Sequence, residues 1–356
     1  MKKNNYDALL RPYWYAAPSF QVIIMGTLFA LAPQIFMLFV TKSYSALGNI
    51  LSAVCASLFA EGINKLLRNT GGFQGMYAGL QGLITGMFFP GEYPILSVFA
   101  LTLCTMLLAK YAFGGPAASW INQAALTVAL AYVVGSRWFP DFLILKSQLA
   151  LENPVARLFM NTQISSLDIR VTGFLNSTVF GFTGALIPAG FFSFFWDSGA
   201  AIPVFRFNVL TLAASIALIV FDIIYWVIPA CFLGVYFLLV LFFAPLAGGG
   251  IFAFGDVLLA ALTGGTLFTA FFMLQWFGTV PQSIKGKIVY GCIAGGFGFI
   301  FCGCGASPAG AVFTVLAANL ASTFIQFYEQ YHRRGDFRNK LLPRIIDFWR
   351  LSHGGN

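Results

Sequence analysis

The chain has 356 residues, of which 59% are hydrophobic and only 9% are charged. Soluble domains carry about 25% charged residues, and a soluble core of this size cannot hide so much apolar surface. The composition therefore predicts an all-α polytopic membrane protein whose first partner is the lipid bilayer. It excludes a soluble enzyme, a nucleic-acid-binding module and a disordered scaffold.

The net charge of +8 is concentrated at the two ends of the chain. Basic residues lie within 1–11 and again after Tyr331, in the run from Arg333 to Arg350. Such clusters can bind nucleic acid, but beside apolar segments they are typical of loops that stay on the cytoplasmic side. We therefore expect both termini to be cytoplasmic, which requires an even number of membrane spans.

The first half contains five apolar segments, and a long polar connection over 137–170 follows them. A span needs about 20 apolar residues, so the shortest of the five reads as a broken or re-entrant helix. With a cytoplasmic start, the polar connection lies outside the cell, and loops of this length are often functional. The five segments are 20–40, 46–67, 77–90, 93–112 and 117–136.

The second half offers six apolar segments, of which parity allows five. The stretch 171–195 holds Gly173 and Pro188 and is interpreted as a broken, re-entrant or interfacial piece. The other five are 205–222, 223–244, 257–277, 286–303 and 308–328. The predicted regions are an N-terminal arm (1–19), a first repeat (20–136), an external loop with the re-entrant segment (137–204), a second repeat (205–328) and a basic cytoplasmic tail (329–356).

The two halves resemble each other in sequence. The run LITGMFF at 83–89 resembles LTGGTLFTAFF at 262–272, and 114–117 resembles 306–310 at a similar offset. Five spans per half make such a repeat inverted, and an inverted repeat with broken helices places a pathway at the interface between the halves. Chance similarity between two glycine-rich apolar helices is the alternative.

Few polar residues lie inside the apolar segments. Glu61 is a functional candidate because a carboxylate within a span is unfavourable, although it could instead pair with Lys65 or reach water. Asp222 is expected in a turn, and Asp256 is expected to cap a helix. Thr263, Gly264, Gly265 and Thr266 could bind an anion, a flavin phosphate or a polar solute, or could only allow close helix packing.

Two cysteines, Cys302 and Cys304, form the one Cys-x-Cys pair. An iron–sulfur cluster usually needs four thiolates, so this pair either shares a cluster with a partner chain or is structural. Both histidines lie in the tail, so a histidine metal site is not expected. The chain also carries no hydrolase or ATPase motif.

Several segments in a fixed order resemble the RnfD/NqrB family, the membrane subunits of the Rnf and Na⁺-pumping NADH:quinone oxidoreductase complexes. They are Leu58–Glu61 with Lys65 and Arg68, LITGMFF, Ala109-Lys110 with Phe113–Gly115, Asn122 with Ala124 and Ala125, Trp226–Pro229, LTGGTLFTAFF, Lys285–Lys287, and Pro308–Gly310 leading to Asn319.

The resemblance implies ten helices in two inverted five-helix repeats, the plan of urea channels, in a bacterial cytoplasmic membrane. It implies other complex subunits as partners and electron transfer through flavin coupled to Na⁺ or H⁺ transport. The candidate ion-pathway residues are Glu61, Thr85, Gly86, Asn122, Pro308 and Asn319.

In that family, FMN is esterified to a threonine in the external loop, and this sequence departs from the motif. The nearest match runs from Thr162 through Ser165 and Ser166 to Asp168, which stands where the acceptor threonine is expected. A carboxylate cannot be the usual phosphoester acceptor. FMN or riboflavin is therefore expected to be held without a covalent bond, or to be lost.

Two functions remain open from the sequence. The first is a membrane subunit of an ion-translocating redox complex. The second is a stand-alone channel for a small polar solute such as urea, which would form a homo-oligomer. Co-purification with redox subunits would favour the first, and solute flux without an electron donor would favour the second.

Overall fold

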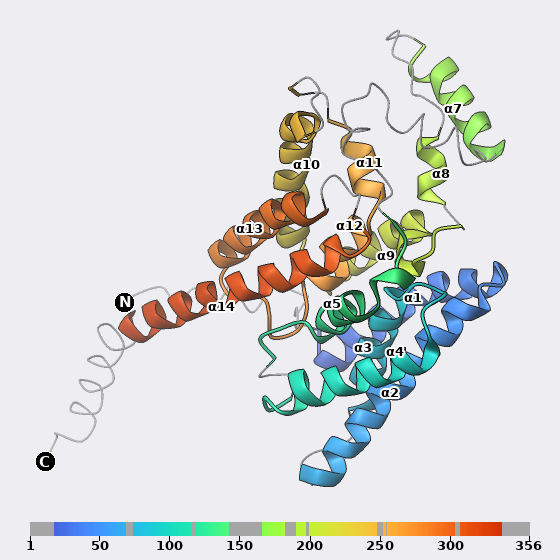
Figure 1. The fold of residues 1–356 in the computed structure, drawn as a ribbon. Coiled ribbons are helices and arrows are strands. Elements are labelled where there is room, and N and C mark those ends of the chain that lie inside the picture. The colour runs from blue at the N-terminus through green and yellow to red at the C-terminus, as the bar shows by residue number, and fades with distance from the viewer. Residues whose placement is uncertain are drawn as a thin grey trace, which may run out of the picture.

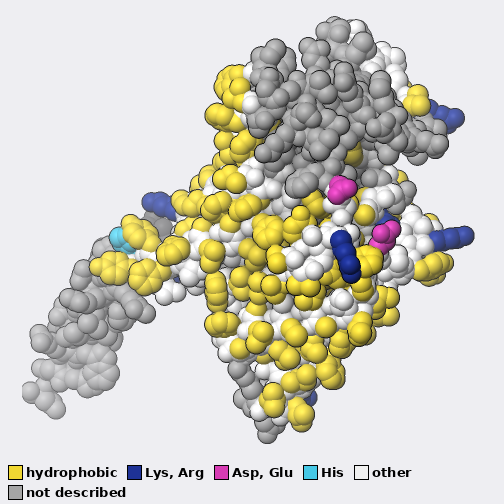
Figure 2. All heavy atoms as spheres, viewed as in Figure 1, with side chains coloured by type: hydrophobic (Ala, Val, Ile, Leu, Met, Phe, Trp, Pro, Cys, Tyr) yellow, Lys and Arg dark blue, Asp and Glu magenta, His cyan; other side chains and the backbone are white. Residues whose placement is uncertain are grey.

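A computed structural model describes residues 18–68, 74–115, 119–141, 166–181, 190–196, 199–247, 252–253, 255–302 and 307–336. Within these ranges the regular secondary structure is entirely helical (Figure 1). Five helices are long and apolar enough to cross a membrane: 20–40, 44–67, 227–246, 284–302 and 310–333. Figure 2 shows that the described surface on one face is largely hydrophobic, with few charged side chains, as expected for contact with lipid.

The helices of the first half follow the predicted segments closely. The predicted segment 117–136 differs, because its helix begins only after Asn122, whose side chain accepts hydrogen bonds from the N–H groups of Ala124 and Ala125. The elements are α1 (Phe20–Val40), α2 (Tyr44–Arg68), α3 (Gly75–Met87), α4 (Ile95–Thr105) with a π-helical continuation (Met106–Tyr111), α5 (Gln123–Gly135) and a 3₁₀ turn (Ser136–Trp138).

The described part of the middle of the chain forms two separate helices, which agrees with the expected broken piece. Helix α7 spans Ser166–Thr178 and α8 spans Phe191–Phe195, and a 3₁₀ turn follows at Pro203–Phe205. The predicted segment 171–195 therefore begins inside one helix and ends with another, and residues 182–189 lie outside the described ranges. In Figure 1, α7 lies at the edge of the molecule, beyond α8.

The second half contains α9 (Asn208–Val220), α10 (Val227–Ala247), α11 (Val257–Leu262), α12 (Thr266–Phe268) with a π-helical continuation (Thr269–Met273), α13 (Ile284–Cys302) and α14 (Gly310–Asp336). The predicted span 257–277 is broken between α11 and α12, where Gly264 and Gly265 have φ of 65° and 69°. This left-handed conformation favours glycine. Asp222 lies in the α9–α10 turn with φ of 56°, and Asp256 caps α11, as expected.

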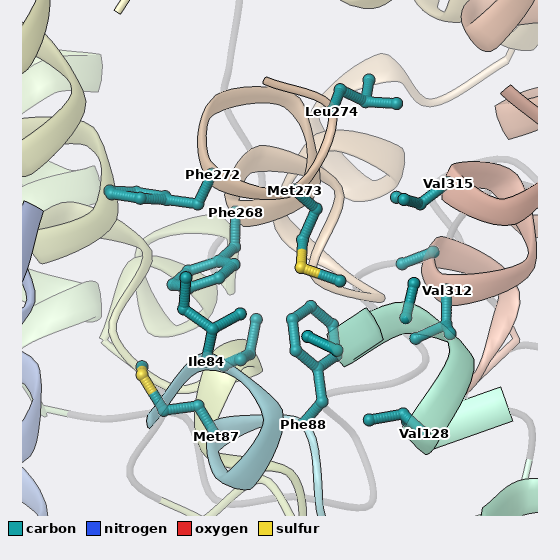
Figure 3. Packing of buried hydrophobic residues seen from close by; sticks show 14 of the residues in the cluster. Ile84, Met87, Phe88, Val128, Phe268, Phe272, Met273, Leu274, Val312 and Val315 are labelled. Carbon is teal, nitrogen blue, oxygen red and sulfur yellow. The ribbon is translucent and has the colours of Figure 1, made fainter. Parts of the chain in front are cut away.

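The core lies where α3 meets the broken α11–α12 segment. Figure 3 shows Ile84, Met87 and Phe88 of this region facing Phe268, Phe272 and Met273, with α5 and α14 beside them. The rings of Phe88 and Phe268 pack edge to face, with centroids 5.6 Å apart. The similar runs LITGMFF and LTGGTLFTAFF therefore pack against each other at the centre of the described structure.

Candidate functional site: a buried ion pair and its polar network

Glu61 lies on α2 and is only 4% exposed. Its Oε1 accepts a hydrogen bond from the backbone N–H of Gln74 at 3.1 Å, and its Oε2 accepts one from the hydroxyl of Tyr111. Lys65, the neighbour one turn away, is exposed. The carboxylate therefore has neither Lys65 nor bulk water as its main partner, and both of those sequence-based interpretations of Glu61 were wrong.

The cation nearest to Glu61 is Lys110, which is fully buried. Its ammonium lies 4.0 Å from Oε2 of Glu61 and donates a hydrogen bond to Oε1 of Gln81 at 2.6 Å. It also lies 4.4 Å from the centre of the Tyr77 ring and 4.7 Å from that of Tyr111. A cation over aromatic faces is favoured, and the opposite charge of Glu61 offsets part of its desolvation.

A π-helix brings Lys110 and Tyr111 to the same carboxylate. Both residues belong to the segment Met106–Tyr111, which continues helix α4. The widened turn contains a hydrogen bond from Ala112 N–H to the carbonyl of Leu107, and another from Gly115 N–H to that of Lys110. Such π-helical segments are often found at functional sites.

A chain of side-chain amides continues from Lys110 into the centre of the protein. Gln81 Nε2 donates to Gln123 Oε1 at 2.6 Å, and Gln123 Nε2 donates to the hydroxyl of Ser119 at 2.6 Å. Trp276, from the second half of the chain, donates its indole N–H to Gln123 Oε1 at 3.3 Å and stacks on Tyr77. All these side chains except Trp276 belong to the first half.

Trp276 also forms a wall of a cavity of about 220 Å³. The cavity lies between the start of α1, α3, the α9–α10 turn and the segment after the second π-helix. Its lining is mainly apolar and aromatic, with Tyr225, Phe271, Phe272, Trp276 and Phe277 supplying the rings. The polar network and this aromatic cavity therefore both contact the indole ring of Trp276.

The other proposed pathway residues have different surroundings. Asn122 caps α5 and donates to the carbonyl of Met273 at 3.1 Å, so it joins the two halves. Thr85 is fully buried and bonds to the carbonyl of Gln81 at 2.7 Å. A Cβ at Gly86 would lie 2.5 Å from Cα of Ile50, so this glycine allows α3 to pack closely on α2.

Two further pathway residues lie on or before α14. Pro308 is buried just before the helix begins. Asn319 is fully buried, and neither polar atom of its side chain has a hydrogen-bond partner among the described residues. The structure brings Glu61 and Asn122 toward the network around Gln123, whereas the side chain of Asn319 makes no hydrogen bond to it.

The two hydroxyls of the Thr263–Thr266 loop donate hydrogen bonds to carbonyl groups of α11 and of the loop itself. Thr263 donates to the carbonyl of Leu259 at 2.6 Å, and Thr266 donates to those of Ala260 and Thr263. A Cβ at Gly265 would lie 2.7 Å from the Phe205 ring. These contacts favour the close-packing interpretation of the loop over binding of a phosphate.

Cys302 is buried on α13, with its sulfur 3.8 Å from the hydroxyl of Thr314, and Cys304 lies outside the described residues. Within the described ranges, no group of three or more His, Cys, Asp or Glu side chains could hold a metal. A cluster shared with another chain stays a hypothesis.

In the expected flavin region, both carboxylate oxygens of Asp168 accept hydrogen bonds that link α7 to α8. Its Oδ1 accepts hydrogen bonds from Thr172 and from Gly190 N–H, and its Oδ2 accepts from the N–H and hydroxyl of Ser193. The residue is 1% exposed. Thr162, Ser165 and the side chain of Ser166 lie outside the described atoms. A flavin held here without a covalent bond therefore stays a prediction.

Sequence reasoning missed most of the network, namely Tyr77, Gln81, Lys110, Tyr111, Ser119, Gln123 and Trp276. One signal was available for Lys110, because a lysine at the end of an apolar segment can point inward as well as toward water. Gln81 gave a weaker signal, a long amide inside an otherwise apolar run.

Comparison with known proteins assigns the sequence of this chain to a family. The model of the NQR2, RnfD, RnfE family matches residues 9–335. The chain is 26% identical over 335 residues to the D subunit of the proton-translocating ferredoxin:NAD⁺ oxidoreductase complex of Clostridium ljungdahlii, covering 93% of this chain and 96% of the relative.

Two other relatives align over most of their length. The D subunit of the Na⁺-translocating ferredoxin:NAD⁺ oxidoreductase complex of Acetobacterium woodii is 26% identical over 92% of this chain and 94% of its own. The D subunit of the ion-translocating oxidoreductase complex of Haemophilus influenzae is 23% identical over 86% and 91%. The family model spans nearly the whole chain, and the chain therefore belongs to the NQR2, RnfD, RnfE family.

Proposed function

We propose that this chain is the membrane subunit of a multi-subunit complex that couples electron transfer to the transport of Na⁺ or H⁺. The observation that carries this proposal is the buried Glu61–Lys110 pair inside apolar helices of a family member. Ionisable residues at membrane depth commonly mark ion pathways. The relatives described above are named as subunits of ion-translocating complexes, which supports other subunits as partners.

The membrane plan in this proposal has ten segments in two inverted halves of five. In support, α1 packs on α9 through a buried hydrogen bond from Gln34 to Thr211 at 3.0 Å, and α5 packs on α14. In a two-fold plan these are the first and the last helices of each half, each meeting its counterpart. The shorter apolar helices 95–111 and 208–220, the short helices α3 and α5, and the broken α11–α12 segment complete the count of ten.

The proposed location is the cytoplasmic membrane of a bacterium, with both termini in the cytoplasm. In this orientation, the start of α1, the end of α2 and the α9–α10 turn lie toward the cytoplasm. Glu61 lies two turns before the end of α2, so it would be reached from that side. Ions would then pass from Glu61 toward the interface between the halves, where Asn122 meets Met273.

A flavin in this subunit would be held without a covalent bond. The aromatic cavity beside Trp276 suits a planar ring, because rings stack on such walls with their edges hydrogen-bonded. Gln275 also lines the cavity, and its buried Nε2 has no hydrogen-bond partner among the described residues. FMN or riboflavin would supply one- or two-electron transfer there, while Trp276 and Gln275 would orient it.

Affinity purification from native membranes under mild detergent tests the assembly. We expect other redox subunits to co-purify, and we expect the band of this chain to show no ultraviolet fluorescence on a denaturing gel. Inverted vesicles should take up ²²Na⁺ or protons when supplied with an electron donor and acceptor. Glu61→Gln should abolish this uptake, while Lys65→Gln, at the exposed position one turn away, should leave it intact.

Two results would contradict this proposal. A chain that purifies alone and carries urea across liposomes without an electron donor would be a solute channel. A fluorescent band would instead show a covalent flavin, and peptide mass analysis would locate its attachment. Neither the described contacts nor the relatives favour the channel.

A further inference from the structure

An open groove of about 650 Å³ lies between α4 and α5, at the end of the bundle where α4 begins. The two helices pack side by side (Figure 1), and the groove is lined by the start of α4 and by the end of α5 with the turn that follows it. The wall at Tyr93 is fixed, because its hydroxyl donates to the carbonyl of Ala131 at 3.1 Å and its ring packs edge to face on Phe139. The groove is therefore bounded by packed elements.

The inner part of the groove is apolar. From Pro94 to Leu101 the lining follows α4 for about 10 Å, at 1.5 Å per residue, and Val134 of α5 lines the same part. Leu96 and Val133, on the same two helices, are 80% and 72% exposed, as expected for side chains in contact with lipid. An apolar groove that opens beside such a surface favours hydrocarbon over water.

The outer part of the groove carries a positive charge. Among the described residues that line it, Arg137 is the one charged side chain, and the neighbouring acidic residues Glu92 and Asp141 are not part of the lining. The guanidinium carbon of Arg137 lies 5.2 Å from the centre of the Trp138 ring. Stacking uses the face of the guanidinium, whereas its N–H donors lie in its plane. Arg137 forms no hydrogen bond or ion pair with a described residue, so these donors are available to an anion.

Two hydroxyls and an indole ring complete the outer part. Ser97 and Ser136 line the groove, and neither hydroxyl has a hydrogen-bond partner among the described residues. Arginine and hydroxyl donors together recognise phosphate, which arginine can bind through two parallel N–H groups. Tryptophan is enriched at the level of lipid head groups, and Trp138 lies at this end of the groove. The groove therefore changes from phosphate-binding to apolar groups over its length, as a phospholipid does.

We propose that this groove binds one anionic phospholipid, with its phosphate at Arg137, Ser97 and Ser136 and an acyl chain along Leu101 and Val134. A soluble anion would leave the apolar part unfilled, and a zwitterionic lipid carries a cation that competes with Arg137 for the phosphate. This inference goes beyond the proposed ion transport and rests only on the proposed placement of α4 and α5 in the membrane. The lipid would lie at the opposite end of the α4 segment from the buried ion pair.

Native mass spectrometry of the protein, purified with its partner subunits, tests the head-group preference. Phosphatidylglycerol and phosphatidylcholine with identical acyl chains are added to delipidated wild type. We expect one phosphatidylglycerol to be retained with an affinity about tenfold above that of phosphatidylcholine, and Arg137→Gln should abolish this difference. Equal retention of both lipids by wild type, or a preference that survives in Arg137→Gln, would overturn the inference.

Lys42 provides the matched control. It is exposed in the α1–α2 turn at the same end of the bundle, where Asn49 of α2 donates to the carbonyl of Tyr93 at 3.2 Å. Lys42 does not line the groove. Lys42→Gln removes the same charge and should keep the preference for phosphatidylglycerol. Equal losses in Lys42→Gln and Arg137→Gln would show a general effect of surface charge and would contradict a specific site.

Two further measurements separate a lipid from a free anion. Ala100 is an exposed residue that lines the apolar part, so Ala100→Phe should fill it and weaken the retention of both lipids. Phosphatidylglycerol should raise the melting temperature of wild type in detergent, and inorganic phosphate at the same concentration should not. If inorganic phosphate stabilises wild type as much as the lipid does, the site binds a free anion and the inference is wrong. Coupled ion uptake by Arg137→Gln would remain, so this failure is distinct from a failure of the proposed function.

Discussion

The side chain of Asn122 makes hydrogen bonds to both halves of the chain at once. Its oxygen accepts from the N–H groups of Ala124 and Ala125, and its nitrogen donates to the carbonyl of Met273, 151 positions away, at 3.1 Å. The residue is fully buried. The start of α5 is thereby fixed to the end of the second π-helix, beside the indole of Trp276.

Asn122→Ala should destabilise the protein measurably. It removes a helix cap, which contributes about 1 kcal/mol, and leaves the Met273 carbonyl without this donor, for about 1–3 kcal/mol more. Asn122→Ser keeps a capping oxygen and loses only the amide donor, so its loss should be smaller. Thermal unfolding in detergent compares the three proteins. Equal melting temperatures for wild type and Asn122→Ala would contradict the joint role.

Gly86 offers a test of how closely α3 packs on α2. A Cβ there would lie 2.5 Å from Cα of Ile50, so Gly86→Ala must move one helix and should cost about 1–3 kcal/mol. Gly79, on the same helix, has no atom within 4 Å of the position that a Cβ would take, so Gly79→Ala should be neutral or stabilise by up to about 1 kcal/mol. Unfolding of both variants measures the difference. A harmless Gly86→Ala would mean that the helices are not in close contact.

The positions of the helices were largely predictable, because apolar length and glycine or proline breaks are local signals. The segment expected at 20–40 forms α1 with the same bounds. The segment expected at 257–277 is present but is broken between α11 and α12, at the glycine pair of the Thr263–Thr266 loop. The start of α5 was placed too early, since the sequence there is apolar enough to continue a span. Only the capping geometry of Asn122 shows where the helix begins.

The candidate site was only partly predictable. Glu61 was identifiable because a carboxylate inside an apolar run is conspicuous by itself. Its partner was not, because Lys110 lies 49 positions away, on the π-helical segment of another helix. Which lysine meets which carboxylate depends on helix packing, and sequence spacing instead favoured Lys65. Trp276 joined the network through contact between the halves, which no local pattern indicates.

Asp168 is expected to be essential for holding α7 against α8. Asp168→Ala removes the acceptor of four hydrogen bonds and leaves the N–H groups of Gly190 and Ser193 without it. We expect a local loss of about 2–4 kcal/mol, with hydrogen bonds to a charged acceptor contributing more than neutral ones. Hydrogen exchange should speed up in α7 and α8 and stay unchanged in α10 and α13. Unaltered exchange in α8 would contradict this role.

The Glu61–Lys110 pair should show strong coupling in a double-mutant cycle. Glu61→Gln alone leaves the buried ammonium without its carboxylate, and Lys110→Met alone leaves the carboxylate without its cation. Either change should destabilise the protein by about 3–5 kcal/mol, because an uncompensated charge stays buried. The double variant has no charge to compensate, so it should recover at least half of the summed loss. Unfolding of all four proteins is compared in the same buffer. Additive losses would mean that the two charges, 4.0 Å apart, do not stabilise each other.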